Sequence, residues 1–227
     1  MPLPNFSQPD VILPFADRHA AGEKLAQAVL EAMREMPESV PCRVYALPRG
    51  GLPIAAPIAQ SLNCPLDIVV AKKITRLENS ELAIGAVTAD GHVVWSPSAE
   101  TDKTTQQDAA LRAAQIQAQA QLNQLAPVSP RFSAQGAIAL LVDDGIATGM
   151  TMAAAVQAVR SQAPLAVWIC APVAPLDLLP YLHELSDRVV LLATPSPFYS
   201  VSRFYKEFPQ VSTETAATYL QQQNPGE

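Results

Sequence analysis

Two short loops contain the residues whose types and spacing could do chemistry. The longer loop reads Asp143-Asp144-Gly145-Ile146-Ala147-Thr148-Gly149-Met150-Thr151. Its glycines and small residues allow backbone N–H groups to turn toward one anion, and Thr148 and Thr151 add hydroxyl donors. A helix that starts in this loop would add a favourable dipole for a phosphate group.

The acidic pair at the start of this loop requires a different partner. Asp143 and Asp144 would repel a phosphate placed against them, so they must face sugar hydroxyls or a metal ion. One ligand with a phosphate, vicinal hydroxyls and a bound cation satisfies both halves of the loop. The alternative interpretation is an acidic turn after a strand.

The shorter loop reads Pro48-Arg49-Gly50-Gly51. A guanidinium fork suits phosphate oxygens, and glycine allows the backbone to approach them closely. The chain has 9 Gly against 21 Pro, so the four glycines in these two loops stand out. An ordinary tight turn is the alternative to a phosphate-binding loop.

Apolar runs and helical stretches alternate along the chain and must position both loops. The runs at 44–47 and 137–142 immediately precede the loops, and others predict strands at 67–71, 166–171 and 188–192. A hairpin is expected from 83–88 and 92–95 around Asp90-Gly91. Helices are expected over 17–36, 54–62, 151–162 and 176–185. Strands that are apolar throughout indicate a mainly parallel, buried sheet, and such sheets bind ligands beyond the carboxyl ends of their strands.

Residues 98–125 are rich in Ala and Gln. An apolar stripe at helical spacing predicts a long amphipathic helix there, with a low-complexity linker as the alternative.

Length and composition limit the class of protein. The 227 residues are 49% hydrophobic and 16% charged, which excludes a disordered chain and favours a single domain over 1–227. A net charge of −6 gives no overall basic field for nucleic acid. No signal peptide and no run of about 18 apolar residues is visible. Three widely spaced cysteines predict reduced thiols. We therefore expect a cytoplasmic protein without nucleic-acid or membrane partners.

Residues 137–149 resemble the 13-residue phosphoribosyl-pyrophosphate (PRPP) signature of type I phosphoribosyltransferases. Further blocks are similar to a broad bacterial group of these enzymes: Phe15-Ala16-Asp17-Arg18, 47–51, 81–86, 193–195 and 208–210. The resemblance implies an α/β fold with an open, mainly parallel sheet flanked by helices. The core would cover about 37–195, with a small hood from 1–20 and 196–227.

The resemblance also implies a reaction, in which a nitrogen nucleophile, a nucleobase, displaces pyrophosphate from PRPP with Mg²⁺ bound. Asp143 and Asp144 would be catalytic, holding the ribose hydroxyls and the metal, directly or through water. Residues 145–151 would bind PRPP, as would Arg49, Gly50 and Gly51 beside the pyrophosphate. A cis peptide is expected at Pro48–Arg49. Phe198 and Tyr199 would bind the small-molecule acceptor, and the family implies a homodimer.

Two lysines end the predicted strand at 67–71. Adjacent side chains of an extended strand point to opposite faces, so one of Lys72 and Lys73 can reach the site. The resemblance favours Lys73 as a catalytic, pyrophosphate-binding residue. Solvated lysines at a strand end are the alternative.

Several features separate the competing functions. Ala147 replaces an acid that hypoxanthine–guanine enzymes carry there, which disfavours a 6-oxopurine acceptor. The loop at 75–80 lacks the Gly and Pro typical of the group. A non-catalytic PRPP-binding regulator is the main alternative to an enzyme. A phosphatase would need an Asp-x-Asp pattern, whereas the two acids here are adjacent. A P-loop nucleoside triphosphatase would need Gly-Lys-Ser/Thr, which the sequence lacks.

Overall fold

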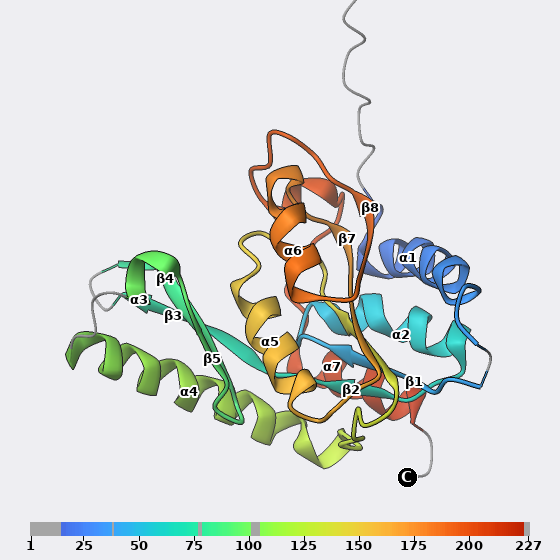
Figure 1. Ribbon diagram of the computed structural model, residues 1–227, viewed down its shortest axis with the longest axis horizontal. Coiled ribbons are helices and arrows are strands. Elements are labelled where there is room, and N and C mark those ends of the chain that lie inside the picture. Colours follow the sequence, from blue (N-terminus) through green and yellow to red (C-terminus); the bar gives the residue numbers. More distant parts are fainter. Residues whose placement is uncertain (1–14, 38, 77–78, 101–104, 225–227) are drawn as a thin grey trace, which may run out of the picture.

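The computed structural model describes residues 15–37, 39–76, 79–100 and 105–224. Its main sheet is fully parallel and has the order β2-β1-β6-β7-β8 (Figure 1). These strands are β2 (Leu66–Ile68), β1 (Cys42–Ala46), β6 (Ile138–Val142), β7 (Ala166–Val173) and β8 (Arg188–Ala193). β6 is buried along its whole length, as its apolar sequence predicts.

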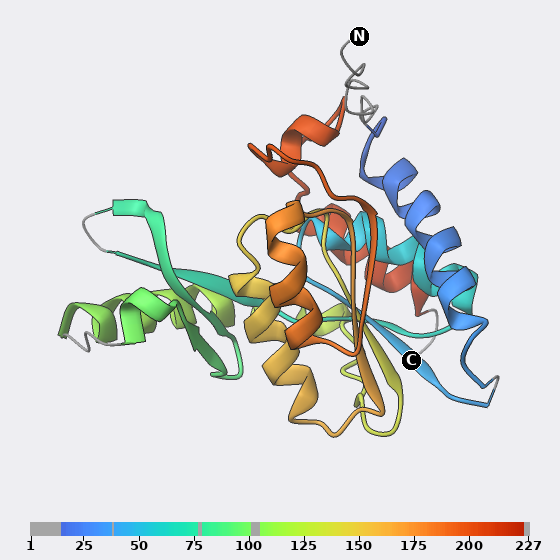
Figure 2. The ribbon, with the colours of Figure 1, turned by 45° about the horizontal axis from the view of Figure 1, so that its top comes forward.

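Helices cover both faces of the main sheet (Figures 1 and 2). On one face, α1 (Arg18–Met33) and α2 (Gly51–Leu62) pack on alternate strand residues such as Val44 and Leu140, and α7 (Thr213–Gln223) lies against α2. On the other, α5 (Met150–Arg160) and α6 (Leu179–Leu185) cover residues such as Leu141 and Ile169. The predicted fold class is confirmed.

A second, antiparallel sheet projects from the body together with a long helix (Figure 2). It contains β3 (Ala71–Arg76), β4 (Asn79–Thr88) and β5 (Val93–Trp95). The short α3 (Pro97–Glu100) and the long α4 (Thr105–Leu125) follow it. The hairpin at Asp90-Gly91 is confirmed, as is a long helix over 105–125 of the predicted 98–125, in which Ala114 and Ala118 are buried.

The single strand expected over 67–71 is wrong, because the chain changes sheets inside it. The Val69 amide still donates to the Ala46 carbonyl of β1, whereas Ala71 pairs with Thr88 of β4. The apolar run is continuous, so its sequence does not mark this crossover. As a consequence Lys72 and Lys73 belong to β3 of the second sheet.

The start of the described chain pairs with the segment 204–206, which precedes α7. The Phe15 amide donates to the Phe204 carbonyl at 2.7 Å, and the Lys206 amide donates to the Phe15 carbonyl at 2.8 Å. Asp17 then caps α1 by accepting from the Ala20 amide at 2.8 Å. Most of the N-terminal part of the predicted hood, residues 1–14, lies outside the described residues.

Three short 3₁₀ helices complete the described elements: η1 (Ala126–Val128), η2 (Leu176–Leu178) and η3 (Val201–Phe204). None of the described helices is both long enough and apolar enough to cross a bilayer.

Candidate functional site

The two glycine-containing loops meet at the carboxyl edge of the main sheet. They follow β1 and β6, which are neighbours with Ala46 in register with Val142. A Cβ atom on Gly50 would lie 2.1 Å from the Asp144 Oδ2 atom, and one on Gly51 would lie 2.6 Å from the Val142 carbonyl oxygen. Contact between the loops therefore requires glycine at both positions.

The shorter loop has the cis peptide that the resemblance implies, between Pro48 and Arg49. The Arg49 guanidinium donates to the Thr213 hydroxyl at 3.1 Å, at the start of α7. The Gln121 side-chain amide of α4 donates to the Pro48 carbonyl at 3.3 Å. The loop is thus fixed from both the body and the projecting lobe.

A cavity of about 540 Å³ opens beside this loop, and we call it the basic cavity. Arg18, Arg49 and Lys72 line it, together with Asp144 and the α4 glutamines Gln117, Gln121 and Gln124. Burial and the nearby Arg49 charge lower the pKa of Lys72. Partial burial and mutual repulsion make these positive charges unfavourable when the cavity is empty. The cavity therefore favours an anionic ligand that binds between them.

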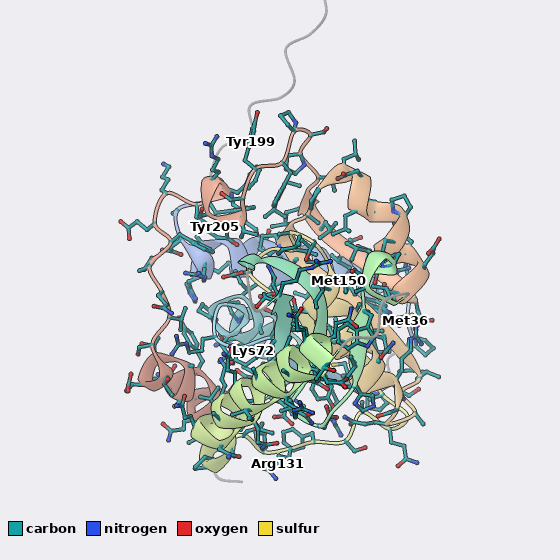
Figure 3. All side chains as sticks on the ribbon, turned by 90° about the vertical axis from the view of Figure 1, so that its left-hand side faces the viewer. Met36, Lys72, Arg131, Met150, Tyr199 and Tyr205 are labelled. Carbon is teal, nitrogen blue, oxygen red and sulfur yellow. The ribbon has the colours of Figure 1, made fainter. Side chains whose placement is uncertain are left out.

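The two predicted lysine positions differ in the structure. Lys72 is half-buried and lines the basic cavity, and Figure 3 shows it beside α4. Lys73 is exposed and is not among the described residues that line this cavity. The geometry therefore places Lys72, rather than the favoured Lys73, next to Arg49. Adjacent strand residues point to opposite faces, so the point at which the chain enters the second sheet, at Ala71, determines which lysine faces the cavity.

Arg18 binds Asp144 and joins three segments of the chain. Its Nε atom donates to the Asp144 Oδ2 atom at 2.7 Å, and its Nη1 atom donates to the Pro209 carbonyl at 2.6 Å. The guanidinium lies 3.6 Å from the centre of the Phe208 ring. In the sequence, Arg18 stands out only as part of a block similar to the bacterial phosphoribosyltransferase group, with no assigned role, whereas the structure shows that it forms a salt bridge with Asp144.

A tyrosine fixes the backbone of the acidic pair. The Tyr205 hydroxyl donates to the Asp144 carbonyl at 2.5 Å, and the Asp144 amide donates to the Asp143 carboxylate at 2.8 Å. Burial raises the pKa of both Asp143 and Asp144, and the Asp144 charge raises the pKa of Asp143 further. The Arg18 charge opposes the shift at Asp144. These carboxylates favour a ligand that supplies hydroxyl donors or a cation.

The rest of the longer loop has the shape expected for a phosphate cradle, with one exception. Gly149 has a positive φ of 74°, and α5 begins at the next residue. Thr148 is exposed and Thr151 is half-buried. The exception is Ile146: its side chain is buried and its amide donates to the Val173 carbonyl at 2.9 Å. The Ile146 N–H therefore anchors the loop and is not free for a ligand.

A second cavity, of about 480 Å³, adjoins the same loop at Ala147, and we call it the proline cavity. Its other lining residues follow β7 and β8: Pro175, Asp177, Leu178, Pro195, Ser196, Pro197 and Phe198. Phe198 stacks on Phe204 with ring centres 5.5 Å apart. Tyr199 is 70% exposed, lies at the outer edge of the molecule in Figure 3, and is not among the described lining residues. Of the two predicted acceptor contacts, Phe198 lines a cavity and Tyr199 does not.

The amino-acid sequence of this chain is similar to those of known proteins. A family model described as "Phosphoribosyl transferase domain" matches residues 17–179. "Putative phosphoribosyl transferase Rv0571c" of Mycobacterium tuberculosis (strain ATCC 25618 / H37Rv) is 35% identical over 211 residues. That match covers 91% of this chain and 46% of the relative, so this chain spans about half the length of that protein.

Two solved structures share the architecture. The crystal structure of TT1426 from Thermus thermophilus has a TM-score of 0.77 and 30% sequence identity, over 92% of this chain and 99% of that one. AQ2163 from Aquifex aeolicus has a TM-score of 0.50 and 14% identity, over 77% and 73% of the two chains, and it shows a shared fold. Because the family match covers well over half of its residues, this chain belongs to the phosphoribosyl transferase domain family.

Proposed function

We propose that this protein transfers the 5-phosphoribosyl group of PRPP to a nitrogen nucleophile. The observation that supports this most is the junction of the two loops, where Gly50 lies against the Asp144 carboxylate beside Arg49 and Lys72. The Asp144 carboxylate can accept hydrogen bonds from the ribose hydroxyls, and the cations in the same cavity can bind the pyrophosphate. In the reaction the bond from the sugar C1 to the pyrophosphate oxygen breaks, a C1–N bond forms, and the nitrogen loses its proton.

Each part of the site has a role in this proposal. Asp143 and Asp144 would accept hydrogen bonds from the ribose hydroxyls, while 147–151 would surround the 5′-phosphate. Arg49 and Lys72 would stabilise the charge that builds on the departing pyrophosphate. Catalysis would come from positioning and from fixed charges, since positive charge develops on the sugar as the bond breaks.

The acidic pair also suits Mg²⁺. Magnesium prefers oxygen ligands and is usually bound by one or two carboxylates plus the phosphate oxygens of the substrate, which Asp143 and Asp144 with PRPP would provide. The ion would supply positive charge that neutralises the pyrophosphate.

The test is calorimetric titration with PRPP and Mg²⁺, followed by a pyrophosphate-release assay with a panel of nucleobases. Asp144→Asn and Arg49→Ala should each weaken PRPP binding at least about tenfold, because each removes a charged partner of the ligand. Asp108→Asn, at an exposed residue of α4, is the matched control for Asp144→Asn. Arg34→Ala, at the exposed C-cap residue of α1, is the matched control for Arg49→Ala.

Three outcomes would decide between the candidates. Binding and turnover that both fall in the site variants support the transferase. Tight PRPP binding with no turnover for any base would favour the non-catalytic regulator instead. Binding that is unchanged in Asp144→Asn and Arg49→Ala would show that the site is assigned wrongly.

A further inference from the structure

The two cavities beside the longer loop carry opposite charges. Three cations, Arg18, Arg49 and Lys72, line the basic cavity, and Asp144 is the one acidic residue among its described lining residues. In the proline cavity, Asp177 is the one ionisable side chain among the described lining residues. The remaining lining is apolar apart from Ser196. A large anion therefore suits the first cavity and not the second.

The loop forms a wall that both cavities share. Asp144 at its start lines the basic cavity, and Ala147 three residues later lines the proline cavity. A displacement at the sugar C1 requires the nucleophile to approach on the side opposite to the leaving group. If the pyrophosphate lies with Arg49 and Lys72, the incoming acceptor reaches a sugar bound at this loop from the side of Ala147.

The shape and chemistry of the proline cavity suit a flat, uncharged ring. Pro175, Pro195 and Pro197 contribute rigid apolar faces, and Phe198 is held in place by its stacking on Phe204. The Asp177 side chain is exposed and makes no hydrogen bond or ion pair with another residue in the described part of the chain. Its carboxylate is free to accept hydrogen bonds from an N–H or amino group.

We propose that Asp177 determines the class of acceptor, selecting uncharged nitrogen heterocycles that carry an amino or ring N–H group and rejecting those that carry a carboxylate. This inference rests on the proposed transferase function, since it concerns the second substrate of the same site. A carboxylate on the acceptor would lie near the Asp177 carboxylate with no lining cation to offset the repulsion.

Nucleotide binding tests the inference without requiring turnover, because a nucleoside monophosphate occupies the phosphate cradle and the base cavity together. AMP and orotidine 5′-monophosphate would be titrated into the wild type, Asp177→Asn and Asp177→Lys. The wild type should bind AMP more tightly than the orotidine nucleotide by about tenfold or more. Asp177→Asn should reduce this preference, and Asp177→Lys should abolish or reverse it.

Glu184→Lys is the matched control, because it makes the same charge reversal at an exposed residue of α6 that is not among those lining the cavity. It should keep the wild-type preference. Ribose 5-phosphate, which lacks a base, should bind all four proteins equally, and this shows that the cradle is folded in each.

The outcomes separate this inference from the one on which it rests. An unchanged nucleotide preference in Asp177→Lys, with ribose 5-phosphate still bound, overturns the role of Asp177 and leaves the transferase intact. A wild-type protein that binds neither ribose 5-phosphate nor PRPP overturns the transferase, and the acceptor inference fails with it.

Discussion

At the scale of single residues, the two adjacent lysines of β3 differ in what they can contact. Lys72 lies beside Arg49, whereas Lys73 points into solvent. Lys72→Ala should weaken PRPP or pyrophosphate binding about tenfold or more, because a charge-assisted contact to phosphate is lost. Lys73→Ala, measured by the same titration, is the matched control and should bind like the wild type. The opposite ranking of the two variants would contradict the arrangement seen here.

A second residue prediction concerns the tyrosine that fixes the acidic loop. Tyr205→Phe keeps the aromatic ring but removes its hydrogen bond to the Asp144 carbonyl, so the free energy of unfolding should fall by about 1 kcal/mol. Tyr199→Phe is the control, because that ring is exposed and its change should stay within about 0.5 kcal/mol. Urea titrations of both variants measure the difference. A free energy of unfolding for Tyr205→Phe equal to that of the wild type would show that the Tyr205 hydroxyl does not stabilise the fold.

Sequence reasoning reached most of the site residues but not their connections. The two loops, the cis peptide and the acidic pair follow from residue type and resemblance. The Arg18–Asp144 pair joins residues 126 positions apart, and the Tyr205 contact spans 61. Such pairs depend on how the ends of the chain pack, which no local pattern encodes. Which of Lys72 and Lys73 lines the basic cavity could not be read from the sequence for a related reason, since it depends on which sheet the strand joins.

At the scale of elements, β6 connects the core to the site. It is the central strand, and Leu140 is fully buried among residues of α1, α2 and the neighbouring strands. Leu140→Ala should lower the free energy of unfolding by about 2–5 kcal/mol, because it removes buried methyl groups and leaves a cavity. Leu165→Ala is the control, because that side chain is 58% exposed before β7. Chemical denaturation measures both, and similar losses would contradict the central position of β6.

Periodicity predicted the elements of the body well and those of the projecting lobe less well. The strands of the main sheet are short, apolar and followed by helices, which is the pattern that a parallel sheet requires. The apolar run at 67–71 has the same pattern, yet it is divided between β2 and β3. The division depends on the hairpin that pairs with Ala71, and this pairing is a tertiary contact.

At the scale of the whole molecule, a buried acid away from the site makes stability depend on pH. Asp67 accepts hydrogen bonds from the Ser129 hydroxyl and from the Ile68 and Phe132 amides, and it fastens the 129–132 segment to β2. Burial raises the pKa of Asp67, against the effect of these hydrogen bonds. The folded state therefore binds this proton more tightly than the unfolded state does.

The raised pKa of Asp67 in the folded state determines whether stability rises or falls with pH. The contribution of Asp67 is fully present below the ordinary pKa of aspartate, about 4, and is lost as the pH rises through the raised value. Asp67→Asn cannot ionise, so the unfolding free energy of the wild type relative to this variant should fall with rising pH. Urea titrations of the wild type and of Asp67→Asn between pH 4 and 8 measure this. Parallel curves for Asp67→Asn would contradict the shift.

The crowding around Asp144 has a consequence for how this sequence can change over evolutionary time. Its carboxylate meets Arg18 and leaves no room for a Cβ atom on Gly50, while its carbonyl meets Tyr205. Substitutions at residues in direct contact are not additive in their effects. A lineage that replaced Asp144 would remove the constraint that keeps glycine at position 50 and leave Arg18 unpaired. These positions should therefore be inherited as a set, and across relatives they should change together.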